Sequence, residues 1–325
     1  MRELTADMVK EFARSKGADL VGIAPIDRFE GAPPQMDPKQ IFPRARSVIV
    51  IAVRIPRGCY RGIHEGTFWA SYMVYGYKRL NLQIRPLIVY ETARFIEDHG
   101  WEAVPVPPHP PESQPWRTPL SPDRPGPDVY PHFRLAAVAA GLGEIGLSKV
   151  FLSPQFGPRQ RLGMILTDAE LEPDPLFDGE ICDRCGRCIS ECPGALSEDR
   201  RVEVQIGGRR FVWADIDTGK CHLAHHGGTA ETSPFFAKTF RGLRIRVRDQ
   251  EMRWGGEVGR FVMALGERIP YHRRMWRQVR GYWAFCGARG CIQACMDHLE
   301  RAGRIKARFK TPFRTRKPWW LRDEG

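Results

Sequence analysis

Eight of the nine cysteines occur at spacings that suit iron–sulfur ligation. In proteins with two clusters, three thiolates of such a run bind one [4Fe–4S] cluster, and the fourth, which precedes proline, binds the other. A structural zinc site needs only four ligands and rarely shows this run. The first group of cysteines therefore predicts a [4Fe–4S] cluster with a second one nearby. It reads Cys182-x2-Cys185-x2-Cys188-x3-Cys192-Pro193.

The second group of cysteines is less regular, with Met296 where ferredoxins usually have proline. Together the two groups supply eight thiolates, enough for two clusters. By ferredoxin logic, we predict one cluster on Cys182, Cys185, Cys188 and Cys295. We predict the other on Cys192, Cys221, Cys286 and Cys291. The ninth cysteine, Cys59, is expected to be a small buried residue, although Tyr60 and His64 beside it leave a role in a site open.

The elements that must position these thiols can be read from the hydrophobic pattern. Apolar, β-branched runs predict strands at 19–25, 47–53 and 161–167. Helical spacing predicts helices at 4–16 with Thr5 as N-cap, at 68–99 with a break near Pro86, and at 133–140. A proline-containing edge strand is expected at 102–107, an irregular loop over a site at 105–131, and a hairpin at 202–213 that turns on Gly207 and Gly208.

The length of 325 residues predicts more than one structural unit. We expect a catalytic domain of mixed helices and sheet at 1–175, because two clusters form an electron path that needs an end point. A two-cluster domain is expected at 176–300, with an arginine-rich insertion at 236–283. A basic, aromatic tail is expected at 301–325.

The positive charge is concentrated at the end of the chain. The formal net charge is +12, and residues 236–325 hold 22 Lys and Arg against 8 Asp and Glu. This surface suggests an anionic partner, such as nucleic acid, an acidic redox protein or an anionic cofactor, although a solvated arginine-rich surface is the alternative. The first residues resemble neither a secretory nor a twin-arginine leader, and no apolar run suits a membrane span. We therefore expect a cytoplasmic protein without membrane contact, in which clustered thiols serve metal chemistry.

Residues 139–168 resemble the core of the cobalamin-dependent iron–sulfur reductases, which comprise reductive dehalogenases and epoxyqueuosine reductases. The similar segments are Ala-Ala-Gly-Leu-Gly-Glu-Ile-Gly-Leu-Ser-Lys at 139–149, Ser153 to Leu162, and Leu166-Thr-Asp168. The order of this core and the two cysteine groups also fits, and Tyr75 to Leu80 resembles a helix of both families. The resemblance implies an α+β protein, with a nitroreductase-like α/β domain that binds a corrinoid and a ferredoxin-like module with two [4Fe–4S] clusters. The spacing of four residues between Cys286 and Cys291 and the missing proline after Cys295 depart from epoxyqueuosine reductases. The identity of the substrate is therefore left open, and a different substrate is an alternative.

The resemblance also implies site residues. Ten residues are expected to bind the cofactor: Gly141, Leu142, Gly143, Glu144, Gly146, Ser153, Phe156, Gly157, Arg159 and Arg161. The glycines would let backbone approach a cofactor, or else form a helix end and turn. The two arginines would hold corrinoid amides or phosphate, or else be surface charges. Tyr130 or Asp128 is expected to donate the proton that reductive cleavage requires, although Asp128 could simply stabilise the loop.

Two further groups are open at this stage. Tyr72 and Tyr75 are three residues apart and should share a helix face, with Tyr77 nearby, as core packing or as part of a site. His222, His225 and His226 are expected at the surface, with a role beside a cluster or a substrate anion as the alternative.

Three functions compete. The first is a corrinoid-dependent reductase of a small organic molecule, fed by an acidic donor such as ferredoxin or flavodoxin. The second is an epoxyqueuosine reductase-like enzyme that modifies tRNA. The third is an electron-transfer or corrinoid-reducing protein without its own substrate. A flavin in place of the corrinoid also stays open, because nitroreductase-like domains hold both.

Overall fold

A four-stranded sheet lies at the centre of the first half of the chain. The computed structural model describes residues 3–107, 119–247, 257–279, 283–286 and 289–321. In spatial order the strands are β1 (Leu20–Pro25), β2 (Ser47–Arg54), β6 (Gln160–Thr167) and β3 (Ala103–Val106), and each neighbouring pair is antiparallel. The three predicted apolar strands are confirmed, with β2 and β6 inside the sheet and β1 at one edge. β3 takes the predicted edge position, where Pro105, which lacks an N–H group, is tolerated.

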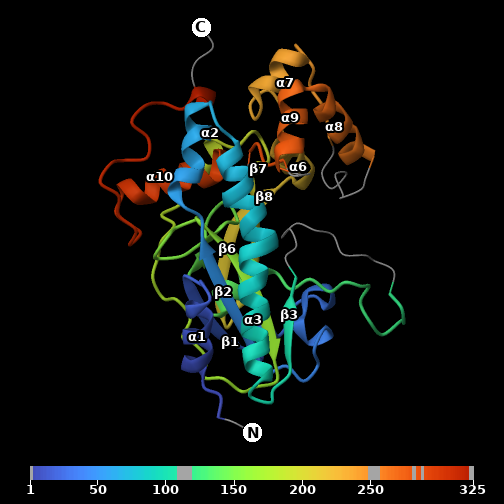
Figure 1. Ribbon diagram of the computed structural model, residues 1–325, viewed down its shortest axis with the longest axis vertical. Helices are drawn as coiled ribbons and strands as arrows, with labels where there is room; N and C mark the ends of the chain where they lie inside the picture. Colours follow the sequence, from blue (N-terminus) through green and yellow to red (C-terminus); the bar gives the residue numbers. More distant parts are fainter. Residues whose placement is uncertain (1–2, 108–118, 248–256, 280–282, 287–288, 322–325) are drawn as a thin grey trace.

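Helices cover both faces of this sheet: α1 (Ala6–Ser15) and α3 (Arg85–Glu97), labelled in Figure 1, pack on one face and α4 (Phe133–Ala139) packs on the other. The side chains of Ile49 and Ile51 on β2 point into the core that contains α1 and α3. Their neighbours Val48 and Val50 point into the core formed with α4. Alternate strand residues face opposite sides of a sheet, so burial on both sides explains the unbroken apolar sequence of β2. The predicted mixture of helices and sheet is therefore confirmed.

The long helix predicted at 68–99 differs in its first half. Two π-helical segments, Tyr72–Lys78 and Leu80–Ile84, precede α3. Pro86 lies in the first turn of α3 and does not interrupt it. The N–H groups of a first turn have no partner within the helix, so the missing N–H group of proline costs no hydrogen bond there. The predicted break near Pro86 is therefore wrong, and the irregularity lies before it. A π-helix pairs residues five apart, so it changes which side chains share a face.

The cysteine-rich half contains the predicted hairpin, formed by β7 (Leu196–Ile206) and β8 (Arg209–Ile216). Its helices are α5 (Arg187–Ser190), α6 (Thr218–His225), α7 (Pro234–Thr239), α8 (Glu257–Arg268), α9 (Pro270–Val279) and α10 (Gly290–Arg301). The remaining elements of the chain are α2 (Arg61–Glu65), β4 (Glu144–Ile145), β5 (Phe151–Leu152) and 3₁₀ turns at Ile26–Phe29, Pro34–Met36, Pro38–Gln40, Arg57–Tyr60 and Trp319–Leu321.

The end of the chain packs back against the rest of the molecule. Phe313 is buried, and Trp319 Nε1 donates a hydrogen bond to the carbonyl of Ile63 at 2.9 Å. Trp320 Nε1 donates to Glu191, which precedes Cys192. The predicted basic tail is thus an ordered covering of α2 and the cysteine region up to Leu321. Within the described residues, every helix is too short or too polar to cross a bilayer.

Candidate functional site

The four cysteines predicted to share the first cluster lie around one pocket. Cys182, Cys185, Cys188 and Cys295 all line it. Cys295 comes from α10, which packs against α5, and the other three come from the loop before α5 and its first turn. Burial raises the pKa of the Cys295 thiol well above its ordinary value, and the thiols of the other three raise it further. These four sulfur atoms therefore lie close enough to hold a common group.

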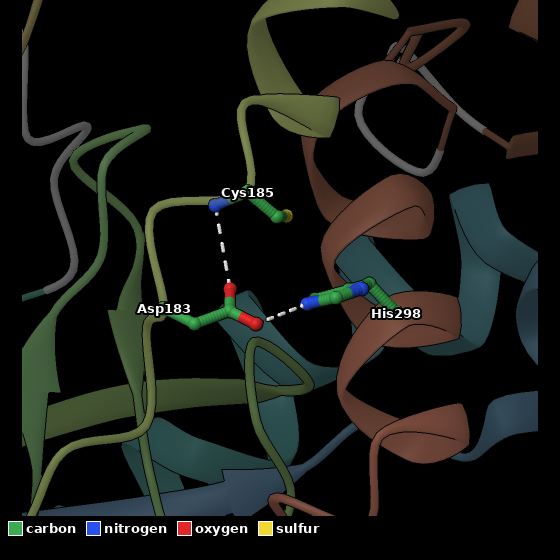
Figure 2. A group of neighbouring side chains, drawn as sticks. All are labelled: Asp183, Cys185 and His298. Atoms are coloured by element: carbon green, nitrogen blue, oxygen red, sulfur yellow. Dashed lines mark hydrogen bonds and ion pairs between the residues drawn. The ribbon is translucent and has the colours of Figure 1, made fainter.

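Two side chains fix the exposed side of this pocket. Asp183 Oδ1 accepts a hydrogen bond from the Cys185 backbone N–H at 3.3 Å, and its Oδ2 lies 2.6 Å from His298 Nε2, as Figure 2 shows. The possible ligand atoms of Asp183, Cys185 and His298 lie within 4.8 Å of one another. Although burial acts to raise it, the hydrogen bond from His298 holds the pKa of Asp183 below its ordinary value. This pair connects the first cysteine loop to α10.

The other four cysteines form a second set beside the first. Burial raises the pKa of Cys291 well above its ordinary value. The thiols of Cys286, Cys192 and Cys221 raise it further, in that order of size. Cys188 of the first set also raises the pKa of Cys291, so the two sets are adjacent. Cys192 thus lies near the distant cysteines, and it also packs in the same cluster as Cys182 and Cys188 of its own run.

Backbone N–H groups point at two of the sulfur atoms. Leu147 N–H donates to Cys182 Sγ at 3.4 Å, and Leu196 N–H donates to Cys192 Sγ at 3.3 Å. Hydrogen bonds to cluster sulfurs are one means by which a protein sets the reduction potential of a cluster. Each cysteine set therefore has a backbone donor directed at one of its sulfur atoms.

A buried arginine supports the presence of an anionic group at the second set. Arg289 is only 2% exposed, and its Nε atom has no hydrogen-bond partner within the described part of the chain. Burial raises the pKa of Cys286, whereas the charge of Arg289 and its hydrogen bond to this thiol act to lower it. A buried cation is costly without an anion. A thiolate-bound cluster would supply that anion, so the residues present fit the group.

Next to the second set lies a group of polar side chains around Arg161. Its Nη2 atom donates to the Tyr72 hydroxyl at 2.9 Å and to the Gly76 carbonyl at 3.1 Å, and its guanidinium lies 4.9 Å from the centre of the Tyr77 ring. Burial raises the pKa of Tyr72, Arg161 acts to lower it, and the thiols of Cys291 and Cys286 raise it. The Tyr72 hydroxyl thus lies within electrostatic reach of the second cysteine set.

The π-helix explains which tyrosines meet there. Tyr72 and Tyr77 are five residues apart, and their ring centres are 6.4 Å apart. Tyr72 is 1% exposed, whereas Tyr75 is 62% exposed. The expectation that Tyr72 and Tyr75 share a face is therefore wrong, because it assumed the spacing of an α-helix.

His225 joins the same group. It lies one helical turn after Cys221 on α6, and its ring centre is 5.3 Å from that of Tyr77. Burial lowers its pKa well below the ordinary value, with smaller contributions from His226, His222 and Arg161. The expectation of a surface histidine holds only in part for His225, which is half-buried against Tyr77; its spacing of four from Cys221 was the available signal. His226 is also partly buried, and its Nδ1 atom lies 2.8 Å from the carbonyl of His222.

The glycine-rich segment at 141–146 makes close contacts within the protein itself. A Cβ atom at Gly141, where φ is +71°, would lie 2.1 Å from the Pro175 carbonyl oxygen. One at Gly143 would lie 2.0 Å from the carbonyl oxygen of Leu152. The segment then runs to the first cysteine set, where Glu144 Oε1 accepts hydrogen bonds from the backbone of Ile181 and Cys182. These residues therefore support the first cysteine loop.

The other residues expected at a cofactor have partners within the protein. Ser153 Oγ accepts from Phe156 N–H and bonds Gln160, and Gly157 pairs with Ser153. Leu142 packs against the second face of the sheet. Arg159 is 2% exposed, donates to the Ile55 carbonyl at 3.0 Å and lies 3.8 Å from Glu300. Of the ten, the structure places Arg161 beside the second cysteine set.

Asp128 and Tyr130 lie on the proline-rich loop. Tyr130 Oη lies 3.4 Å from Asp128 Oδ2, and burial followed by the charge of Asp128 raises the pKa of Tyr130. Gln35 holds this stretch through the carbonyls of Gly126 and Asp128. Asp128 is exposed, and part of the same loop, 108–118, lies outside the described residues. Cys59, elsewhere, is buried as expected, and burial raises its pKa.

Comparison with known proteins supports the resemblance found in the sequence. Over 91 residues, 27% of this chain, it is 42% identical to a tetrachloroethene reductive dehalogenase of Desulfitobacterium hafniense, and the match spans 16% of that protein. Over 250 residues, 68% of this chain, it is 28% identical to an epoxyqueuosine reductase of Gloeobacter violaceus and spans 66% of its length. A solved catabolic reductive dehalogenase covers 94% of this chain and 38% of its own, with 16% identity and a TM-score of 0.49. The chain matches no protein-family model.

Proposed function

This chain is a relative of the reductive dehalogenases and the epoxyqueuosine reductases, and we propose that it is itself a reductase with two [4Fe–4S] clusters. One observation carries the proposal: eight cysteines form two adjacent sets, and the Arg161 group lies directly beside the second. We assign residues 1–175 to a nitroreductase-like domain and residues 176–300 to a ferredoxin-like module. The substrate is a small organic molecule. The polar group of Arg161, Tyr72, Tyr77 and His225 is enclosed by side chains of the protein, so a macromolecule would not reach it.

The two sets define the direction of electron flow. Of the eight ligand cysteines, all of which are described, Cys185 alone is exposed. A cluster held by the first set would therefore be the one that an acidic donor such as a ferredoxin or flavodoxin could reach. A cluster held by the second set would lie between it and Tyr72, because the Cys188 thiol acts on Cys291 and the Cys291 thiol acts on Tyr72. The thiols must stay reduced to bind iron, which supports a cytoplasmic location.

The chemistry of the Arg161 group is proton delivery. Replacement of a halide by hydrogen consumes two electrons and one proton and releases the halide ion. Tyr72 holds its proton at neutral pH because burial raises its pKa, and Arg161 would stabilise the phenolate that remains after transfer. Burial lowers the pKa of His225 well below its ordinary value, so this histidine is neutral and adds no charge to the group. Tyr130 and Asp128 remain the alternative donor pair on the proline-rich loop.

We propose a corrinoid as the organic cofactor, on the sequence resemblance of residues 139–168. A bound corrinoid supplies a strongly reducing, nucleophilic metal centre. The polar group of Arg161, Tyr72, Tyr77 and His225 would contact it. They would orient the substrate, hold the proton and exclude water.

Anaerobic reconstitution tests the proposal. We expect iron and sulfide equivalent to two [4Fe–4S] clusters per chain, a corrinoid absorption spectrum after incubation with cobalamin, and halide release from a halogenated aromatic or alkene substrate with a reduced donor. A protein that holds both clusters but binds no corrinoid would refute the cofactor assignment. A protein that holds both cofactors but needs a second protein for any turnover would favour an electron-transfer role.

The arginine-rich helices favour a second candidate, an enzyme that modifies tRNA. Arg273, Arg274 and Arg277 line one hollow on α9, and none of these side chains has a hydrogen bond or ion pair with another described residue. Like charges one turn apart destabilise a helix unless an anion binds them. If RNA is that anion, affinity for a tRNA anticodon stem-loop falls steeply between 50 and 200 mM salt, and Arg273→Ala with Arg277→Ala weakens it. Binding that is absent at low salt rules out this function.

A further inference from the structure

Arg289 is a buried positive charge for which the described residues offer no carboxylate. It stands at the start of α10, immediately before Gly290, and is 2% exposed. Its backbone N–H donates to the Cys286 carbonyl at 2.7 Å, which places it in the turn that carries a predicted ligand of the second cluster. The two remaining buried arginines of the described residues each donate a hydrogen bond to a backbone carbonyl. Arg85 donates to that of Leu162, and Arg159 donates to that of Ile55. The Arg289 guanidinium is therefore directed at the sulfur set.

Two tryptophans of the tail cover this guanidinium. The Arg289 guanidinium carbon lies 5.3 Å from the centre of the Trp320 ring and 5.9 Å from that of the Trp319 ring. The two indoles are perpendicular to each other, with ring centres 5.5 Å apart. Aromatic faces attract a cation without neutralising it, so the charge keeps its full effect on its other neighbours. The tail thereby excludes water from the charge and does not compensate it.

The neighbouring charges of the tail cancel one another. Arg314 also stacks on Trp320, but its two terminal nitrogens bond both carboxylate oxygens of Glu191 at 2.5 and 2.8 Å. Such a bidentate pair is close to neutral from a distance. Arg289 is thus the unbalanced charge on this side of the second cysteine set.

We propose that Arg289, enclosed by Trp319 and Trp320, is a positioning residue that raises the reduction potential of the second cluster relative to the first. This inference rests on the proposed function, in which both sets hold clusters. When one electron leaves the reduced first cluster and enters the oxidised second cluster, the second gains one negative charge. A fixed, water-excluded cation beside Cys286 stabilises that charge, because Coulomb interactions are stronger away from water. The electron is then favoured on the cluster next to the Arg161 group.

The test is a redox titration of the anaerobic holoprotein, followed by electron paramagnetic resonance. Arg289→Met keeps the length of the side chain and removes its charge, and Arg289→Lys keeps the charge. In Arg289→Met we expect the equilibrium constant for reduction of the second cluster to fall at least tenfold, which is 59 mV for one electron, with the first cluster unchanged. Arg289→Lys should retain most of the wild-type potential. Arg277→Met is the matched control, since it removes an exposed arginine of α9, and it should shift neither cluster.

An unchanged second potential in Arg289→Met, or an equal shift of both clusters, overturns the proposal. If Arg289→Met does not assemble its second cluster, Trp320→Leu decides, because it keeps every cysteine and the charge but admits water. A more negative second potential in Trp320→Leu supports the proposal, and an unchanged one overturns it. Iron analysis of the wild type separates the two hypotheses, since a wild-type protein without a second cluster contradicts the proposed function itself.

Discussion

Removal of one hydroxyl group should separate proton delivery from electron delivery. In Tyr72→Phe the ring stays, but Arg161 loses the partner that accepts its hydrogen bond at 2.9 Å. Hydrogen bonds to charged groups contribute about 1.5–3 kcal/mol to stability. Because Arg161 retains the Gly76 carbonyl at 3.1 and 3.2 Å, we expect a loss near the lower end, about 1.5 kcal/mol. General acid catalysis contributes about 100-fold to 10,000-fold, so turnover should fall at least about 100-fold.

The assay is substrate reduction by the reconstituted enzyme, together with the resonance spectra of both clusters. Tyr75→Phe is the matched control, because it removes the same hydroxyl from an exposed side chain three residues away. We expect Tyr75→Phe to keep full turnover and both variants to keep both cluster signals. Turnover in Tyr72→Phe equal to that of Tyr75→Phe, with clusters intact, would refute the assignment of Tyr72 and favour the loop pair Asp128 and Tyr130.

Three further changes test the site and its surroundings. Cys295→Ser should abolish the cluster of the first set and Cys291→Ser that of the second, each halving the iron content, and loss of the same cluster in both variants would contradict the partition. Burial lowers the pKa of His272 to about 3, so the unfolded chain binds more protons below pH 6.5 and stability falls as the pH falls from 6.5. The loss is about 2 kcal/mol at pH 5, and it should be absent in His272→Gln when unfolding by urea is compared at pH 5 and 7. Glu191→Gln leaves Arg314 as an unpaired, nearly buried charge, so it should destabilise the protein by about 3 kcal/mol and expose the tail to proteolysis, whereas unaltered proteolysis would show that the ion pair does not hold it.

The central sheet could be predicted from the sequence because its signals are local. A strand buried on both faces needs an unbroken apolar run, and 47–53 is such a run. The edge position of β3 followed from Pro105, and the hairpin from its paired glycines. In each case one or two residues restrict the backbone conformation enough to determine the element. The local sequence is therefore sufficient to predict it.

The meeting of Tyr72 and Tyr77 could not be predicted, because it depends on a rare helical form. The sequence from Tyr72 to Lys78 contains Gly76, but a single glycine does not distinguish a π-helix from an α-helix. What the wider turn gains is tertiary: it brings two tyrosines to one guanidinium on β6 and leaves Tyr75 in solvent. π-Helical turns occur frequently at functional sites. The local failure of sequence reasoning therefore coincides with the residues assigned to proton delivery.

The glycine-rich segment illustrates the opposite difficulty, a clear signal with more than one physical cause. A glycine is required wherever backbone approaches closely, and the sequence does not say what approaches. Here the nearest atoms to Gly141 and Gly143 are carbonyl oxygens of the chain itself. The same segment delivers Glu144 and the Leu147 N–H group to Cys182. Its geometry thus connects the sheet domain to the first cysteine set.

The arginines of the chain lie in two kinds of surroundings, solvent and aromatic side chains. The α9 arginines are exposed and lack partners within the described part, so they act on whatever approaches from solvent and are screened by salt. Arg161 and Arg289 are surrounded by aromatic rings, where screening is weak; Arg289 lies beside Cys286, and Arg161 bonds Tyr72, which the thiols of the second set reach. Because electrons are drawn toward the cluster nearest a fixed cation, these two arginines, and not the net charge of +12, are expected to set the direction of electron flow.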